Sequence, residues 1–382
     1  MVIVSLPKFH PMQIQELTAY LETLAPLSLQ ESYDNSGLII GHSSTEITKA
    51  LICLDVTEEV MKEAIQQGCN LIIAHHPLIF SGIKKINGKN YTERLIILAI
   101  QHQIAIYAIH TNLDNVMRGV NFKIGEVLGL QDLKILEPKI GILKQLITYV
   151  PDNLTDSGEN AVLKVRNALW EAGAGKIGNY SSCSFNVEGS GTFKPLEGAT
   201  PFIGEINSLH EQKEIKMSVI FPENIENQVI KALKSAHPYE EAAYEVIALS
   251  NPHPEIGAGM IGTFPEPITE LEFLKLLKTA FRCNIVRHTA LINKKIKKLA
   301  FCGGAGSFLL KTAMAQGADA FVSGDFKYHQ FFDADGKILI ADIGHFESEQ
   351  YTIDLLYDAI HEKFRNFALL KTQINTNPVN YF

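Results

Sequence analysis

The sequence is poor in the features that stabilise small secreted proteins or anchor membrane proteins. Its 382 residues include only five cysteines, and no two of them form a C-x-x-C pair. We therefore expect reduced core thiols rather than a disulfide framework or a thiolate metal cluster. No apolar run approaches the roughly 20 residues that a membrane-spanning helix needs. The opening segment Met1–Lys8 lacks the basic and long apolar stretches of a secretory signal, so we expect a cytoplasmic protein with no membrane partner.

Positive charge is also scarce, because 34 basic side chains face 42 acidic ones and give a formal net charge of −8. A nucleic-acid surface is not indicated, since such surfaces carry clustered lysine and arginine. The densest basic run, at residues 294–298, has no interleaved aromatic side chain and is typical of a solvated turn. Hydrophobic residues make up 46% of the chain, so its length predicts two or three compact units with buried cores.

Alternating strand-like and helix-like segments predict the main fold. Short apolar runs indicate buried strands, and amphipathic segments between them indicate helices, as in βα units on a mostly parallel sheet. A second block in the same style, from residue 271 to residue 364, predicts a duplicated α/β main domain. In the first block we expect strands at 50–54, 71–74 and 104–109, and helices at 12–24, 58–67 and 92–102.

The two blocks share a local sequence pattern. Val60–Gly68 aligns with Leu309–Gly317 without a gap, and an apolar strand follows each segment. Helix-plus-glycine segments also resemble one another by chance, so duplication and coincidence both stay open. A duplication would place the polar residues after both sets of strands at the same edge of one sheet, the carboxyl edge at which open α/β sheets bind ligands.

The middle of the chain has a different pattern. The order of its expected elements suits a ferredoxin-like β-α-β-β-α-β domain inserted into the main domain. We therefore predict a main domain of residues 1–132 plus 254–382 and an inserted domain of residues 133–253. Its elements are expected as a strand at 145–150, a helix at 160–171, a strand pair at 182–194, a strand at 214–221, a helix at 225–236 and a strand at 243–249.

Polar residues follow three of the strands predicted for the main domain, where packing gives no reason for them. Each cluster alone is also consistent with an exposed strand end or a solvated carboxylate in a first helical turn. His345 and Glu349 are four residues apart, so one helical turn can present both side chains to one ion. Together the three strand ends predict a metal site. Its candidate ligands are His75, His76, Asp114, His345 and Glu349.

Three imidazoles and two carboxylates exceed what one tetrahedral zinc ion with an open position requires, but they fit two bridged ions. We therefore expect two divalent metal ions per chain. Nitrogen and oxygen ligands without thiolates suit zinc, iron or manganese, and the ligand types do not rank these metals.

Six segments, in order along nearly the whole chain, resemble the Nif-three-like family. They are Tyr33–Leu38, His75–Pro77, His110–Asp114, His237–Glu241, Gly324–Asp325 with His329, and Gly344–Glu349. Members of this family are often labelled GTP cyclohydrolase I type 2 homologues. The resemblance implies that the five candidate ligands hold two metals, and that chains assemble as toroidal homohexamers with the metal sites facing an inner cavity. This chain departs from the family only mildly at Tyr33, where tryptophan is common.

Three further residues are weaker candidates. His110, Asp325 and His329 could transfer protons or orient the metal ligands, although ordinary hydrogen bonding at strand ends explains them as well. The glycine-rich segment Gly303–Ser307 could cradle a phosphate, but a tight strand-to-helix turn is the commoner explanation. His237–Glu241 is interpreted as structural, with its two glutamates as the alternative site of another ion.

Two functions stay open at this stage. A dinuclear metal-dependent hydrolase would use water activated by the metals. The family label implies attack at C8 of the GTP purine, and a phosphoester substrate suits the same chemistry, so the expected partner is a small molecule such as a nucleotide. The alternative is a metal-binding regulatory or scaffold protein without turnover, in which the insert binds a ligand or partner.

Overall fold

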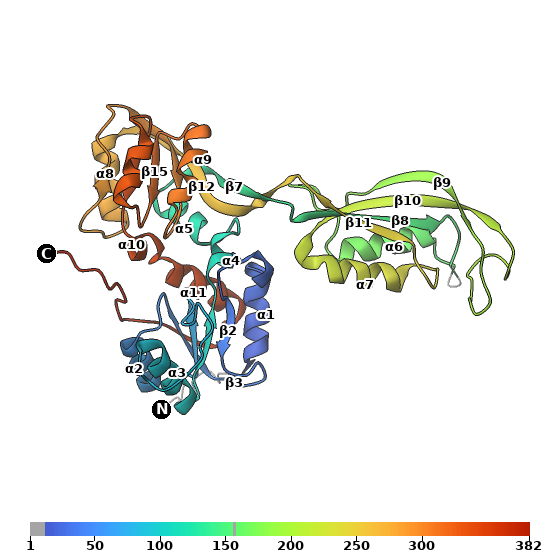
Figure 1. The fold of residues 1–382 in the computed structure, drawn as a ribbon, viewed down its shortest axis with the longest axis horizontal. Coiled ribbons are helices and arrows are strands. Elements are labelled where there is room, and N and C mark those ends of the chain that lie inside the picture. The colour runs from blue at the N-terminus through green and yellow to red at the C-terminus, as the bar shows by residue number, and fades with distance from the viewer. Residues whose placement is uncertain (1–11, 156–157) are drawn as a thin grey trace, which may run out of the picture. The chain divides into compact units, whose positions relative to one another are not determined.

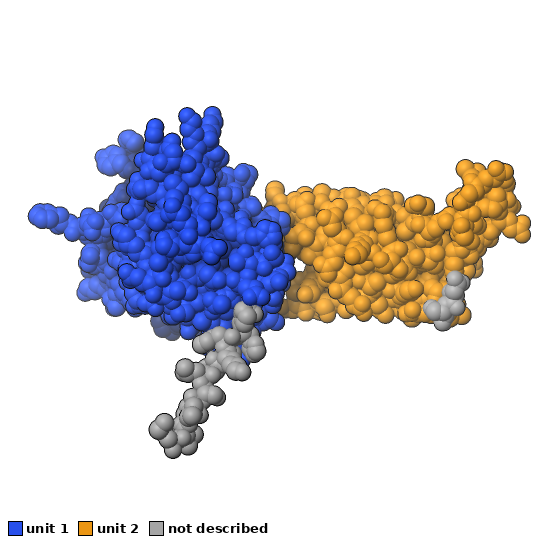
Figure 2. Space-filling view, turned by 90° about the horizontal axis from the view of Figure 1, so that it is seen from below, with its two compact units in different colours: residues 1–138, 255–382 blue, residues 139–254 orange. Residues whose placement is uncertain are grey.

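The structure, a computed structural model, describes residues 12–155 and 158–382. The opening segment Met1–Lys8 therefore lies outside the described residues. The chain divides into two compact units (Figure 2). Unit 1 comprises residues 1–138 and 255–382, and unit 2 comprises residues 139–254. None of the helices within the described ranges is long and apolar enough to cross a membrane.

The inserted domain begins slightly later in the chain than the expected residue 133. Residue 133 lies inside strand β7 (Gln131–Ile140), which pairs with β12 (Pro252–Thr269) in a sheet of unit 1. Ile135 and Leu136 of β7 are buried in the core of unit 1. The segment 133–138 thus belongs to unit 1, because its apolar side chains pack there.

Unit 1 contains a five-stranded, mostly parallel sheet of the expected kind. Its order is β17-β4-β5-β6-β2, and only β2 runs antiparallel to its neighbour. Ala74 of β5 pairs with Ala108 of β6, so these two strands end level with each other. The bounds are β2 Gly37–Ile40, β4 Lys49–Cys53, β5 Leu71–Ala74, β6 Ala105–Ala108 and β17 Ala368–Lys371.

A second, six-stranded sheet in unit 1 has the order β13-β16-β15-β14-β12-β7. Its three central strands β14, β15 and β16 are parallel, whereas β13 and β12 are antiparallel to their neighbours. The remaining bounds are β13 Arg287–His288, β14 Lys295–Phe301, β15 Ala320–Ser323 and β16 Leu339–Asp342. Strands β5, β6, β15 and β16 are short, fully buried and mostly apolar, which is why they could be predicted.

Helices cover both sheets, so the α/β class predicted for the main domain is confirmed (Figure 1). One large core joins the facing sides of the two sheets through α1 (Ile14–Leu24), α5 (Val120–Val127), α8 (Glu270–Ala280) and α11 (Thr352–Lys363). Helices α2 (Glu58–Gln67) and α3 (Tyr91–Gln101) pack on the other side of the first sheet. Helix α9 (Leu310–Ala315) packs on the other side of the second sheet.

The segments that resemble each other in sequence also have similar local structure. Helix α2 begins at Thr57, whose side chain accepts a hydrogen bond from the Val60 amide, and ends at Gly68 in the left-handed conformation (φ +68°). Gly317, after α9, is also left-handed (φ +72°). Each glycine lets its helix end and lead directly into a buried parallel strand, β5 or β15.

Unit 2 contains six main elements in the order β8-α6-β9-β10-α7-β11. Its sheet has the order β11-β8-β10-β9, and all three strand pairs are antiparallel. Both helices pack on one face, over a core that includes Leu146, Met217 and Val229. The bounds are β8 Leu143–Pro151, α6 Ala161–Glu171, β9 Phe185–Phe193, β10 His210–Pro222, α7 Glu226–Ala236 and β11 Tyr244–Leu249.

One expectation for unit 2 was wrong. Residues 182–194 do not form a strand pair, because β9 continues as one strand through Gly189, Ser190 and Gly191. These three residues pair in register with β10, opposite Glu214, Lys213 and Gln212. The glycines therefore extend the strand without side chains instead of making a turn.

Candidate metal centre

The first two candidate ligands lie where β5 ends. The backbone bends at His75 and His76, while their amides still donate to the carbonyls of Cys53 (3.1 Å) and Leu54 (2.9 Å). Because of this bend, both rings reach the same site, and their centroids are 4.9 Å apart. His75 is fully buried.

The other candidate ligands lie on short helices that follow strands. Asp114 ends α4 (Thr111–Asp114), which follows β6, and its side chain is 24% exposed. His345 and Glu349 begin and end α10 (His345–Glu349), which follows β16. The Nε2 atom of His345 lies 3.2 Å from Oε2 of Glu349, so the two residues share one helical face as predicted.

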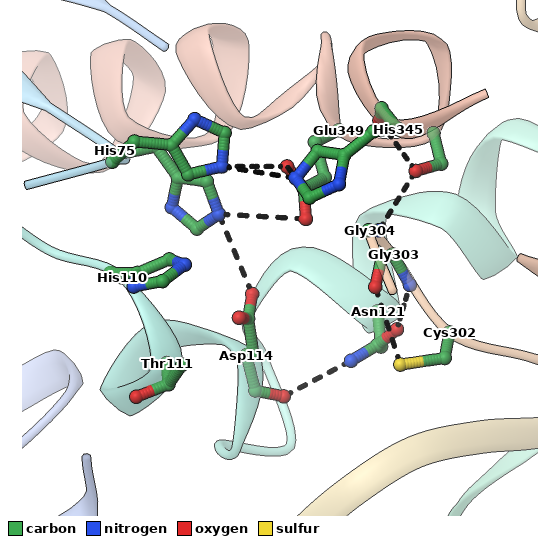
Figure 3. Close-up of polar contacts among 12 residues, drawn as sticks. His75, His110, Thr111, Asp114, Asn121, Cys302, Gly303, Gly304, His345 and Glu349 are labelled. Atoms are coloured by element: carbon green, nitrogen blue, oxygen red, sulfur yellow. Dashed lines mark hydrogen bonds and ion pairs between the residues drawn. The ribbon is translucent and has the colours of Figure 1, made fainter. Parts of the chain in front are cut away.

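Glu349 lies at the centre of the cluster (Figure 3). Its Oε2 atom is 3.0 Å from Nε2 of His76, and its Oε1 atom is 3.9 Å from Nε2 of His75. The side chain is only 3% exposed. A carboxylate this deeply buried requires positive charge around it, and the imidazoles alone supply such charge only when they bind protons.

Each of the four histidines at the site has its Nδ1 atom fixed by an acceptor, so the Nε2 atom is left for the site. For His75 the acceptor is the carbonyl oxygen of Ile109, at 2.8 Å. The other three acceptors are carboxylates, and we assign the Nδ1–H tautomer from these partners. They are Asp55 for His76 (2.8 Å), Asp34 for His110 (2.8 Å) and Asp325 for His345 (2.7 Å).

Two buried atoms at the site have no hydrogen-bond partner among the described residues. They are Nε2 of His75 and Oδ1 of Asp114, which face each other at 3.6 Å. Burial without a partner costs each polar atom free energy, and a cation bound by both would remove that cost. The donor set therefore fits a divalent metal ion.

The electrostatics of the site indicate the same need for cations. Burial lowers the pKa of His76, but its hydrogen bonds to Asp55 and Glu349 outweigh burial and raise the pKa to about 10. For His345, burial has the same lowering effect, and Glu349 and Asp325 raise the pKa to about 9. Burial and the nearby Glu349 charge raise the pKa of Asp114 to about 7. The negative charge of the site thus favours protons on these side chains, and divalent cations can take the place of those protons.

The ligand atoms form three groups of three, and the atoms of each group lie within 4.8 Å of one another. One group is His76, His345 and Glu349, and a second is His75, Asp114 and Glu349. The structure therefore brings all five candidate ligands together, with Glu349 common to two groups. The third group joins His75 and His76 to His110.

The three weaker candidates differ in their positions. His110 lies beside the cluster, with its ring centroid 5.3 Å from that of His75. Asp325 is in the left-handed conformation (φ +58°) and contacts the cluster only through His345 among the described residues. His329 is exposed on the 3-10 helix η4 (Tyr328–Ala334), and its ring contacts are with Tyr328 and Phe332.

Sequence reasoning missed several residues that hold the histidines. Asp55 accepts from His76 and also from the Thr376 hydroxyl (2.7 Å) near the end of the chain. Asp34 accepts from His110 and from the amide of Thr111 (3.0 Å), and these bonds overcome burial to hold the pKa of Asp34 well below its usual range. The only sequence signal was that Asp55 follows a buried strand and that Asp34 lies in a recognised motif.

The glycine-rich segment forms a tight turn against the site. The amides of Gly303 and Gly304 donate to the side chains of Asn121 and Ser348, both at 2.9 Å (Figure 3). The Gly306 amide donates to the Ser323 hydroxyl at 2.8 Å. These three amides are therefore already used, which favours the turn over the phosphate cradle. A Cβ atom on Gly304 would lie 2.4 Å from Oε1 of Glu349, so the turn also makes room for the central carboxylate.

Fold and site together define a two-unit α/β protein with a buried histidine–carboxylate cluster at the carboxyl ends of its parallel strands. The profile of the family described as Duf34/NIF3 (NGG1p interacting factor 3) matches residues 12–378. The chain belongs to this family, which confirms the resemblance seen in the sequence.

Similar proteins match over nearly their whole length. The chain is 39% identical over 373 residues to a GTP cyclohydrolase 1 type 2 homolog of Halalkalibacterium halodurans, covering 96% of this chain and 98% of that protein. It is 36% identical over 372 residues to the Bacillus subtilis protein of the same name, with coverages of 96% and 98%. The crystal structure of a Bacillus cereus protein related to NIF3 superposes with a TM-score of 0.82 at 36% identity, covering 98% of this chain and 100% of that one.

Proposed function

We propose that unit 1 is a dinuclear metal-dependent hydrolase. Its two divalent ions, zinc, iron or manganese, are held by His75, His76, Asp114, His345 and Glu349. The observation that carries this proposal is the pair of groups that share Glu349, together with the two buried atoms that lack partners. Each oxygen of Glu349 faces a different group, as expected of a carboxylate between two ions.

Hydrogen bonds within the chain orient the proposed ligands. The acceptors on the Nδ1 atoms fix the rotation of each imidazole, so every Nε2 lone pair points to the cluster. Among the proposed ligands, His345 has the most exposed side chain (38%), followed by Asp114 (24%). We therefore expect the substrate to approach over these two residues.

Cations bound at this site would make water acidic enough to act as a nucleophile near neutral pH and would balance negative charge that develops on the substrate. The names of the relatives support a guanine-nucleotide substrate. We propose attack at C8 of the GTP purine, and a phosphoester is the other substrate that suits the site. Asp325 acts as a positioning residue for His345, and His110, beside the cluster, is the candidate for proton transfer. A role for His329 stays a prediction from sequence.

Metal analysis and a formate-release assay with GTP test this function. We expect two ions per chain, and we expect Asp114→Ala, His75→Ala and Glu349→Ala to lose metal and turnover while keeping circular dichroism spectra of the wild type. Less than one ion per chain after reconstitution would contradict the site. Full metal loading without turnover of GTP, other nucleotides or phosphoesters would favour the alternative, a metal-binding regulatory or scaffold protein.

The assembly and location are proposed on separate grounds. We propose a toroidal homohexamer, which the family resemblance supports and which light scattering can test. A cytoplasmic location is supported by the free state of all five cysteines, since such thiols persist in reducing compartments. Fractionation of cells that express the protein would test it.

A further inference from the structure

Unit 2 contains a cavity of its own, of about 540 Å³, which is within the usual range for small-molecule sites. Strands β8, β9 and β10 and the segment that follows β9 all contribute to its lining. Most of the exposed lining is apolar. None of the proposed metal ligands lines it, so its ligand need not be the hydrolase substrate.

Part of the cavity wall consists of strand without side chains. Gly189 and Gly191 lie two apart on β9, so they share a face, and Gly189 pairs directly with Glu214 of β10. Glycine inside a strand weakens it and often marks a place that a ligand approaches closely. A Cβ atom on Gly191 would lie 2.2 Å from Oε2 of Glu214, so this glycine leaves room for the carboxylate.

Aromatic rings form a second part of the wall. The Tyr239 ring makes tilted contacts with the rings of Phe193 and Phe202, with centroid distances of 5.9 and 6.3 Å. Its hydroxyl donates to Oε1 of Glu214 (2.9 Å), and its amide donates to Nδ1 of His237 (3.1 Å). Both ends of Tyr239 are therefore fixed, and the rings are ready to stack with a flat ligand.

His237 supports this wall from below the surface. It is 7% exposed, and its Nε2–H donates to the carbonyl of Tyr149 (3.0 Å) while its Nδ1 accepts from the amide of Tyr239. The residue is thus structural, as the sequence analysis concluded for this motif. It connects Tyr149 and Tyr239, which both line the cavity.

The charged groups of the lining restrict the ligand further. Four glutamates and two lysines line the cavity: Glu188, Glu214, Glu240, Glu241, Lys194 and Lys216. The ammonium of Lys216 already lies over the ring of Tyr149, 5.9 Å from its centroid, so the protein itself occupies that position for a cation. A neutral ring that donates N–H groups to carboxylates and accepts from a lysine suits this lining better than an organic cation does.

We propose that this cavity binds the base of a purine nucleoside that carries both an amino and a carbonyl group. The base stacks on Tyr239, donates its N–H groups to free carboxylate oxygens such as Oε2 of Glu214, and accepts at its carbonyl from Lys216. Aromatic stacking with a base tolerates any flat ring, so the selection among bases comes from these polar groups. This site is independent of metal in unit 1.

Equilibrium dialysis of the full chain with guanosine tests the proposal. Guanosine lacks phosphate, so it avoids general attraction to lysines or metals, and inosine, which lacks only the amino group, is the matched ligand. We expect one saturable guanosine site per chain, with the same affinity before and after metal removal by a chelator. Inosine should bind about tenfold more weakly, the usual discrimination from one lost polar contact of this kind.

Three variants locate the site. Gly189→Val is expected to fold, because a Cβ atom there meets only the Glu214 carbonyl oxygen at 3.9 Å and a β-branched side chain suits a strand. The valine side chain should fill part of the cavity and weaken guanosine binding at least about tenfold, on the scale of one lost stacking contact. Glu214→Gln should reduce the preference for guanosine over inosine. Tyr180→Leu, at a 75% exposed tyrosine of unit 2 outside the lining, is the control and should bind as wild type.

Four results would overturn the proposal. The first is no saturable binding at millimolar guanosine, and the second is wild-type affinity in both Gly189→Val and Glu214→Gln. The third is loss of guanosine binding when metal is removed. The fourth is a wild-type protein that binds no nucleoside while Gly189→Val changes the mass of the assembly in solution. The third would move the nucleoside to the metal centre, and the fourth would make the cavity a contact between copies of the chain.

Discussion

Replacement of Asp55 tests whether the groups behind the histidines control metal binding. Among the described residues, the proposed ligand to which Asp55 hydrogen-bonds is His76, whose Nδ1–H it accepts at 2.8 Å. Asn in its place keeps an oxygen acceptor but loses the negative charge, whereas Ala loses both and leaves the ring of His76 free to rotate. Thr376, which donates to the other oxygen of Asp55, offers a milder change one step farther from the cluster.

The expected magnitude follows from the position of the carboxylate. Loss of a group that orients a metal-bound histidine costs roughly 10- to 100-fold in metal affinity. The Asp55 side chain is 36% exposed, so solvent screens its charge. We therefore expect Asp55→Asn to lose metal affinity by an amount near the lower end of this range. A tenfold loss corresponds to about 1.4 kcal/mol. Asp55→Ala should lie near the upper limit, and Thr376→Val below Asp55→Asn.

A competition titration with a fluorescent zinc chelator measures these affinities. The control is Asp354→Asn, which removes the charge of a carboxylate of unit 1 that pairs with Lys371 at the surface (2.8 Å) and makes no ion pair with a proposed ligand among the described residues. If Asp55→Ala and the control shift the zinc affinity equally, or neither shifts it, then His76 is not a ligand oriented by Asp55. In that case the acceptors on the Nδ1 atoms do not control metal affinity by orienting the histidines.

Three further predictions use other parts of the structure. Gly304→Ala should lower the metal content, because the methyl group would displace the buried central carboxylate. Gly317→Ala, also at positive φ, should lower only the melting temperature, because its methyl group would meet no atom within 4 Å. A chain that joins Pro138 to Glu255 through a short linker should fold and keep its full metal content, because β7 stays in its sheet. Burial lowers the pKa of His237, so the unfolded chain binds more protons below about pH 6.5 and acidification should destabilise unit 2. The melting temperature of His237→Gln should then fall less steeply with acidification than that of the wild type.

The sequence predicted the parts of the molecule that depend on local patterns. The buried parallel strands are short apolar runs, and His75, His76 and His345 were visible because polar residues follow such runs without a packing reason. The direction of parallel strands then brings their carboxyl ends to a common edge. The convergence of His75, His76 and Asp114, which follow β5 and β6 of one sheet, therefore needed no knowledge of distances. His345 and Glu349 follow β16 of the second sheet, so the expectation of a single sheet edge was wrong, and their approach to the other three ligands became evident only from the fold.

The groups that orient the ligands could not be predicted in the same way. Asp55 and Thr376 are 321 positions apart, and nothing in either local sequence indicates that the second donates to the first. Aspartate near a strand end is common, so its partner becomes evident only from the fold. The single strand β9 was mistaken for a pair because Gly-Ser-Gly is typical of turns, and only pairing with β10 shows that it continues.

The position of Glu349 has a consequence for how the centre fills. In the proposed dinuclear centre one carboxylate faces both sets of ligands, so the first cation to bind would fix this side chain and neutralise its charge before the second cation binds. The two binding events are therefore thermodynamically linked, and any effect of one ion on the affinity of the other acts equally in reverse. Ordering of the shared side chain favours the second ion, while repulsion between the cations and competition for the same charge oppose it. The shape of a metal titration, with one step or two, measures which of these effects is larger.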